Sequence, residues 1–545
     1  MANPVTSDQP APEPQPVPAT PSADIPSTGT PSTGTPSTGT PPADVQQAGT
    51  APARLGPGPE QLAAHRISPR FYNADLAPSR KEGRSWTAYS VFSLWANDVH
   101  SLGNYGFALG LFALGLGAWQ ILLALLVGAG LLFVLLTLSG FMGHKTGVPY
   151  PVMCRIAFGI HGAQLAASVR GIVAIAWFGI QTYLAANVLN VLLLTLVPGL
   201  QSWAEVEFLG LSGLGWFSFT VLWIVQVIIV SYGMEMIRKY EAIAGPIILA
   251  TFLALAIWML VRVDFRISFS IDDPLTGWEM WTNILGGGAL WVAIYGTFVL
   301  NFSDFTRSAK KRGSIVVGNF WGIPINMLVF GLVVISLAGA QYTIDGTVIS
   351  SPADIVQEIG SPILLALASL SLLVLTIAVN LMANFVAPTY ALTNLFPRHL
   401  NFRKAAIISA IIGFAILPWN LYDSPVVIVY FLGGLGALLG PLFGVIMVDY
   451  WVVRKTKVNV PQLYTEAGDG EYFYHHGVNW RAIGAFVPAA LLSLILALVP
   501  AFASVSQFSW FLGAGIAAII YFVIARRDFT FREVDGEEIA VPTAH

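Results

Sequence analysis

"NDVHSLGNYG", residues 97–106, is a polar stretch between two long apolar runs. It holds an Asp, a His, two Asn and two Gly; WTAYSVFSLWA precedes it, and FALGLFALGLGAWQILLALLVGAGLLFVLL follows it. Backbone at membrane depth can be irregular only where protein buries it or where it lines a watery cavity. The stretch therefore predicts a break in the first of a series of membrane-spanning helices.

The composition agrees with a membrane protein. Of 545 residues, 55% are hydrophobic and 10% are charged, whereas a soluble domain has about 25% charged residues. Apolar runs of about 20 residues, the length that crosses a bilayer, recur from residue 88 to residue 525. A β-barrel would instead show short alternating segments. We therefore expect an all-α, polytopic protein in a lipid bilayer.

Several function classes find no support in the sequence. The net charge of −3 gives no indication of a nucleic-acid partner, and the single cysteine, Cys154, excludes an internal disulfide or a cysteine-based metal centre. The chain has no P-loop, no HExxH and no GxSxG motif. We expect neither an enzyme nor a bound cofactor, and we expect a monomer whose partner is a small molecule.

Both ends of the chain differ from the middle. Residues 1–84 are rich in Pro, Ser, Thr and Ala, and "PSTGT" occurs three times between Pro26 and Thr40. Such a segment buries too little apolar surface to offset the entropy of ordering it. We predict a disordered tail over 1–84 and a second short tail over 528–545.

The apolar runs predict twelve spans, an even number that places both termini on one side. They are 88–115, 117–141, 163–198, 213–233, 240–262, 282–303, 314–340, 361–387, 404–420, 424–451, 481–502 and 507–525.

The distribution of basic residues over the loops indicates on which side of the membrane the termini lie. One set of loops and ends holds Arg80, Lys81, Arg84, Lys145, Arg155, Arg238, Lys239, Arg307, Lys310, Lys311, Arg312, Arg398, Arg403, Lys404, Arg454, Lys455, Lys457, Arg526 and Arg527. The alternate loops hold only Arg262 and Arg266. Because Lys and Arg favour the cytoplasmic side, both termini are predicted to be cytoplasmic, in the cell membrane.

A second interrupted helix is predicted at 282–303. "LGGGALW" (285–291) lies near its start, and "NFSDFTR" (301–307) lies at its end. The two interrupted helices lie five apart, which is typical of an inverted-repeat secondary transporter with substrate at the midplane. The alternative is that the glycines only let two helices pack closely.

Two other spans carry paired polar groups at a spacing that shares one helix face. Trp177 and Gln181 form one pair, and Asn380 and Asn384 form the other. An aromatic face beside carboxamides suits a flat, neutral heterocycle, because the ring stacks and the amides bond to its edge. The alternative is that these groups only join helices through hydrogen bonds.

Longer motifs point to a family. "WFGIQTYLAANVL", "VNLMANFVAPTYALTNLFPR", "ILPWNL", "LGPLFGVIMVDYWVVR" and "LYTEAGDGEYFYHHGVNW" resemble the nucleobase:cation symporter-1 family, over residues 70 to 525. The resemblance implies a 5+5 inverted-repeat fold, as in amino-acid/sodium symporters, with two extra helices. The ten-helix core would span 85–451, and the extra helices would lie within 452–527.

The resemblance also implies a substrate site. It places a stacking Trp and its polar partner at Trp177 and Gln181, and a substrate-binding Asn at Asn384, with Asn380 one turn earlier. A second stacking aromatic falls on Tyr295, with Trp291 one turn away as the alternative.

Cation coupling departs from the pattern of the sodium-coupled hydantoin carrier. The two hydroxyl residues that help to bind its cation align here to Ala378 and Val379, and a hard cation needs oxygen ligands. We therefore favour a co-transported proton over sodium, with Asn97, Asp98 and His100 as coupling residues and Asp98 or His100 as the carrier. The alternative is that Asp98 and His100 only pair with a neighbouring helix.

The sequence thus predicts cation-coupled import, by alternating access, of a small neutral nucleobase or cyclic amide. Uracil is favoured, with allantoin or hydantoin next. The alternative is a transporter of the same fold for an amino acid or another zwitterion, but Asp98 beside the break argues against a bound carboxylate.

Overall fold

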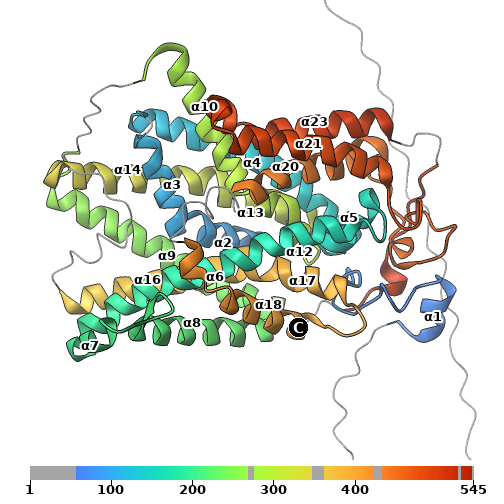
Figure 1. Ribbon diagram of the computed structural model, residues 1–545, viewed down its shortest axis with the longest axis horizontal. Coiled ribbons are helices and arrows are strands. Elements are labelled where there is room, and N and C mark those ends of the chain that lie inside the picture. The colour runs from blue at the N-terminus through green and yellow to red at the C-terminus, as the bar shows by residue number, and fades with distance from the viewer. Residues whose placement is uncertain are drawn as a thin grey trace, which may run out of the picture. The chain divides into compact units, whose positions relative to one another are not determined.

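The computed structural model describes residues 57–113, 115–267, 275–346, 361–422, 433–525 and 530–542. Its long helices run side by side, horizontally in Figure 1. Eight helices in these ranges are long and apolar enough to cross a membrane, or nine if the bent pair Pro500–Ser506 and Ser509–Ile524 is one span. The membrane-spanning segments are all α-helical, as predicted. The count of twelve spans stays a prediction.

The spans are α4 (Ala118–Thr146), α6 (Ala163–Leu196), α8 (Gly213–Ser231), α9 (Met234–Arg262), α13 with η2 and α14 (Arg312–Phe320, Trp321–Ile325, Asn326–Asp345), α16 with η3 and α17 (Pro362–Asn380, Leu381–Phe385, Val386–Leu395), α20 with η5 (Gly433–Met447, Val448–Val453), and α21 (Trp480–Leu498). Shorter elements include α5 (Tyr150–Phe158), α7 (Gln201–Ala204), β1 (Glu207–Phe208), β2 (Leu211–Ser212), α18 (Phe402–Ala415), α19 (Pro418–Tyr422), α22 (Ala503–Ser506) and α23 (Ser509–Ile524).

The predicted break in the first span is present. It separates α2 (Ala88–Val99) from α3 (Leu102–Ala113) at His100 and Ser101. Carbonyls at the end of α2 lose their helical partners there, and the Asn104 side chain donates to two of them, those of Asp98 (2.8 Å) and Val99 (3.2 Å). The polar residues of this stretch therefore satisfy backbone groups that an apolar surrounding would leave unpaired.

The second break lies later than the glycines suggested. α10 (Gly277–Ile294) ends at Tyr295, and α11 (Gly296–Asn301) and α12 (Ser303–Thr306) continue the chain. The glycines 286–288 lie inside α10 instead. A Cβ on Gly288 would stand 3.1 Å from the Ala124 carbonyl of α4. The close-packing alternative is therefore correct for these glycines: Gly287 and Gly288 let α10 and α4 approach, and Gly286 packs against Gln507.

The span over α16 and α17 contains one wider turn. The π-helix η3 places an extra residue in the turn before α17, and such turns are frequent at functional sites. The carbonyl of Ala383 in this turn accepts a hydrogen bond of 2.7 Å from Arg170 of α6. A long buried side chain thus satisfies backbone that the irregular turn exposes.

The prediction of a disordered 1–84 is wrong for residues 57–84, whereas residues 1–56 lie outside the described ranges. α1 (Pro59–Ala64) is helical, and Leu76 and Ala77 have no exposed surface. Arg307 donates to the carbonyls of Asp75 (3.0 Å) and Ala77 (2.6 Å). Apolar side chains and one guanidinium thus anchor a segment whose composition alone suggested disorder.

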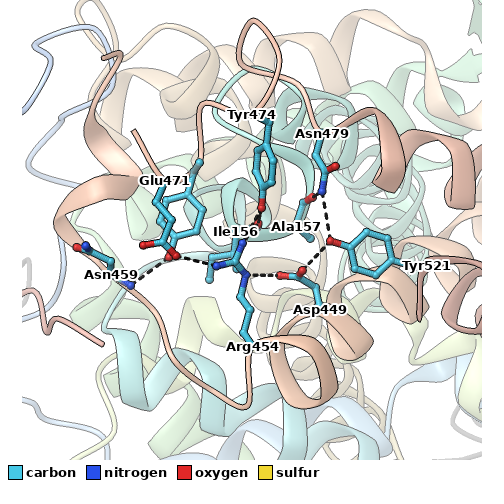
Figure 2. A network of polar contacts seen from close by, with 10 residues as sticks. Ile156, Ala157, Asp449, Arg454, Asn459, Glu471, Tyr474, Asn479 and Tyr521 are labelled. Atoms are coloured by element: carbon cyan, nitrogen blue, oxygen red, sulfur yellow. Dashed lines mark hydrogen bonds and ion pairs between the residues drawn. The ribbon is translucent and has the colours of Figure 1, made fainter. Parts of the chain in front are cut away.

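A buried polar network joins residues 449–521 to α5 (Figure 2). Arg454 donates to the carboxylates of Asp449 (2.8 Å) and Glu471 (2.8 Å). Asp449 also accepts from the Tyr521 hydroxyl of α23 at 2.6 Å, and Asn479 donates to the Ala157 carbonyl of α5 at 2.6 Å. A charge that is paired on several sides can be buried without a large net cost, so this network fixes α5, η5 and α23 against one another.

Candidate functional site

A cavity of about 600 Å³ lies where the two breaks and the π-helix meet. It is bounded by the break between α2 and α3, by α6, by the end of α10, by η3, and by α20, α21, α22 and α23. This volume suits a small ring compound, because ligand pockets range from about 300 to 1,000 Å³.

Four of the five predicted substrate residues line this cavity. They are Trp177 and Gln181 of α6, Tyr295 after α10, and Asn384 of η3. Trp291, the alternative to Tyr295, does not line it and packs in the core against Phe107 and Phe330. Side chains that are far apart in sequence, two aromatic and two carboxamide, thus face one space.

Asn380, the fifth predicted residue, lies behind the cavity wall. Its amide group donates to the Gln226 carbonyl oxygen (2.7 Å) and to the Thr182 hydroxyl (3.0 Å). Its own side-chain oxygen accepts from Asn384 at 3.0 Å. Asn380 therefore positions Asn384 rather than lining the cavity, and the bond leaves the Asn384 carbonyl oxygen and one N–H available to a ligand.

Where the two breaks meet, the cavity wall contains an acid, Asp98, beside the phenol of Tyr295. Asp98 lines the cavity with 6% of its surface exposed, and its carboxyl lies against the Tyr295 hydroxyl. Asn104 donates to the same hydroxyl at 2.9 Å. The two broken helices are thus joined at their breaks, so a ligand between them would contact both at once.

The other two predicted coupling residues point elsewhere. The His100 ring packs between Phe252 and Phe330, with centroid distances of 5.6 and 5.7 Å, and its Nε2 pairs with Asn326 at 3.2 Å. Asn97 donates to the Glu241 carboxylate and to the Ser93 carbonyl. Neither residue lines the cavity, so only Asp98 of the three could meet a ligand there.

Sequence reasoning missed three polar residues near this region. Arg170 supports η3, Asn104 joins the breaks, and Glu241 bonds to Asn97. Asn104 stood inside the quoted polar stretch and was not singled out. The predicted span 240–262 placed Glu241 at a helix end, where an acid is unremarkable, whereas α9 begins at Met234 and carries it inside the membrane span.

Comparison with known proteins identifies the family. A family model described as permeases for cytosine/purines, uracil, thiamine and allantoin matches residues 78–513. The chain belongs to this family. It is therefore a multi-pass membrane transporter of nucleobase-type compounds and not an enzyme.

Curated relatives agree with this assignment. The chain is 34% identical to an allantoin permease of Bacillus subtilis over 84% of this chain and 94% of the relative. It is 32% identical to a purine-uracil permease of Arabidopsis thaliana, over 80% and 72% of the two chains. It is also 32% identical to a putative allantoin permease of Escherichia coli, over 86% and 97%.

Solved structures share the fold. A nucleobase-cation-symport-1 family transporter, solved in a closed conformation with bromovinylhydantoin bound, matches with a TM-score of 0.70 at 23% identity, over 86% of this chain and 98% of that chain. A Na+-coupled sialic acid symporter matches with a TM-score of 0.55 at 12% identity, over 87% and 98%. These likenesses concern the fold, and they agree with the inverted-repeat architecture that the two breaks predicted.

Proposed function

We propose that this protein imports a small, neutral cyclic amide and that the cavity between the broken helices is its binding site. The observation that carries the proposal is the joint placement of Trp177, Tyr295 and Asn384 on one cavity. A flat ring can stack on the aromatic side chains, while an –NH–CO– edge pairs with a carboxamide that has both a donor and an acceptor.

Uracil and allantoin are the first two candidate substrates. Both carry –NH–CO– groups in a small ring, and hydantoin shares this edge. The sequence motifs favoured uracil, and relatives named allantoin permease and purine-uracil permease support both compounds. Gln181 lines the same cavity as Asn384, so a bound ring can meet two carboxamides.

We further propose that a proton drives import. Ala378 and Val379 are buried and offer no side-chain oxygen to a sodium ion. Asp98 lines the cavity and can take up or release a proton where a substrate would lie. An acid inside a membrane span marks an ion or proton pathway by default, and so Asp98 is the coupling residue that we favour.

The proposed setting is the cell membrane, with both termini in the cytoplasm. The distribution of Lys and Arg over the loops supports this orientation. Among the described residues, the N-terminal segment and residues 530–542 lie together, because Ser79 pairs with Val541 and Lys81 with Asp535. This proximity supports the proposal that both ends of the transporter lie on one side of the membrane.

Uptake measurements test the proposal. Cells that express the protein should accumulate radiolabelled uracil or allantoin saturably, and excess hydantoin, cytosine or adenine should identify the preferred ring by competition. A protonophore should abolish accumulation, whereas replacing sodium by choline should not. Inhibition by amino acids alone would favour the zwitterion alternative, and sodium dependence without protonophore sensitivity would contradict proton coupling.

A further inference from the structure

Behind the cavity wall, α2 and α9 enclose a second polar cluster that the substrate site does not use. Glu241 of α9 has 1% of its surface exposed, and Ser93 and Asn97 of α2 have none. Asn97 donates to both the backbone carbonyl (3.0 Å) and the carboxylate of Glu241. Gly245 of α9 lies against Ala96 and Ser93 of α2 at this crossing.

Three oxygen atoms of this cluster have no hydrogen-bond partner. They are Oε1 of Glu241, Oδ1 of Asn97 and Oγ of Ser93, and each is fully buried. A buried polar atom without a partner is destabilising. Orphaned acceptors around a carboxyl group are well suited to a mobile proton, because a proton on the carboxyl turns one acceptor into a donor.

The titratable residues on the elements that pack against α9 show which group could exchange a proton with Glu241. α9 packs against α2, α8, α14 and α16. α8 and α16 carry no titratable residue. In α14 the titratable residues are Tyr342 and Asp345, both in the last turn of the helix.

On α9 itself, Tyr240 donates to the Val374 carbonyl of α16, and Arg238 is paired with Glu235 one turn nearer the helix start. On α2, Asp98 directly follows Asn97, the residue that bonds to Glu241, and His100 beyond it is bound to Asn326. No described cation pairs with Glu241, so a charged carboxylate there would be costly.

We propose that Glu241, with Asn97 and Ser93, forms a second proton-carrying site that exchanges its proton with Asp98 during transport. This inference rests on the proposed proton coupling and adds the route that the proton takes. The proton leaves the Asp98 carboxyl and joins the Glu241 carboxylate, so the total charge of the two acids is unchanged. Asp98 of α2 lines the substrate cavity, whereas Glu241 of α9 lies against α2 at Asn97, outside that cavity.

The position of Glu241 gives this route a direction. It lies seven residues after Met234, the first residue of α9, which is about 10 Å along the helix. The start of α9 follows Gly233 and carries Glu235, Arg238 and Lys239, so it is the predicted cytoplasmic end. Glu241 therefore lies between the cavity acid and the side on which an importer releases its proton.

The test uses the full-length protein in proteoliposomes, with radiolabelled allantoin and uracil as probes. A pH difference of one unit supports about tenfold accumulation for one coupled proton. Wild type should reach this ratio, and Glu241→Gln should only equilibrate the probe across the membrane. Exchange of internal for external probe without a gradient should persist in Glu241→Gln, because exchange needs no net proton movement.

Two further variants control the experiment. Glu235→Gln removes an ion-paired acid on the same helix and should accumulate probe as wild type does. Glu241→Asp keeps the carboxyl and should restore part of the accumulation. Accumulation by Glu241→Gln at the wild-type ratio would overturn the inference, as would loss of exchange together with accumulation. Absence of proton-driven accumulation in wild type would instead contradict the proposed coupling itself.

Discussion

Trp177 presents the largest ring among the predicted substrate residues that line the cavity, and it tests the stacking part of the account. Replacing it by alanine should weaken substrate affinity by about 1–3 kcal/mol, the usual cost of losing a stacked base. Trp177→Phe should retain part of the affinity, because a smaller ring still stacks. Concentration dependence of uptake measures this, and equal affinity of both variants and wild type would remove Trp177 from the site.

Asn384 tests the hydrogen-bonding part. Asn384→Ala should raise the KM for uptake or abolish it, since an unpaired ring edge in a buried site costs about 1–3 kcal/mol per group. Ser371→Ala is the matched control on the same span, because Ser371 is half-buried, does not line the cavity, and donates its hydroxyl to the Leu367 carbonyl. Normal uptake by Asn384→Ala, at wild-type amounts in the membrane, would place the substrate elsewhere.

Among elements, the contact between α4 and α12 allows a direct test of packing. A Cβ on Gly143 of α4 would stand 2.5 Å from the Cα of Ser303. Gly143→Ala should therefore destabilise the protein by about 1–3 kcal/mol. Gly130→Ala on the same helix meets nothing within 4 Å and should be neutral or slightly stabilising. Thermal unfolding in detergent compares the two, and equal Tm values would contradict this packing.

Elements also show what the sequence could predict. The break at 97–106 was predictable because an Asp and a His are costly inside an apolar span and occur there mainly at functional sites. The sequence placed the second break at the glycines 286–288, whereas the structure has it at Tyr295. Three successive glycines can either interrupt a helix or let it pack closely against a neighbour, and the sequence alone does not distinguish these cases. The π-turn η3 has no local sequence signal, and the role of Asn380 as a support became visible only through its bonds to Gln226 and Thr182.

For the whole molecule, the N-terminal segment divides into two parts. Deleting residues 2–56, the Pro-, Ser- and Thr-rich part, should leave uptake intact. Deleting residues 2–75 should lower stability and uptake, because it removes buried Phe71 and the bond from Tyr72 to the Ile539 carbonyl. Fluorescence-detected size exclusion and uptake on the same cells compare the deletions, and equal behaviour of the two would show that residues 57–75 contribute nothing.

Occupancy of the cavity by substrate is the central claim, and site-directed labelling tests it most directly. The native Cys154 is fully buried, so a maleimide should label wild type slowly. A cysteine placed by Ser101→Cys would line the cavity at the first break, and one placed by Asp469→Cys would lie on an exposed loop. Uracil or allantoin should slow labelling at position 101 and leave position 469 unchanged. Equal labelling at position 101 with and without substrate, in a variant that still transports it, would show that the substrate does not bind in this cavity.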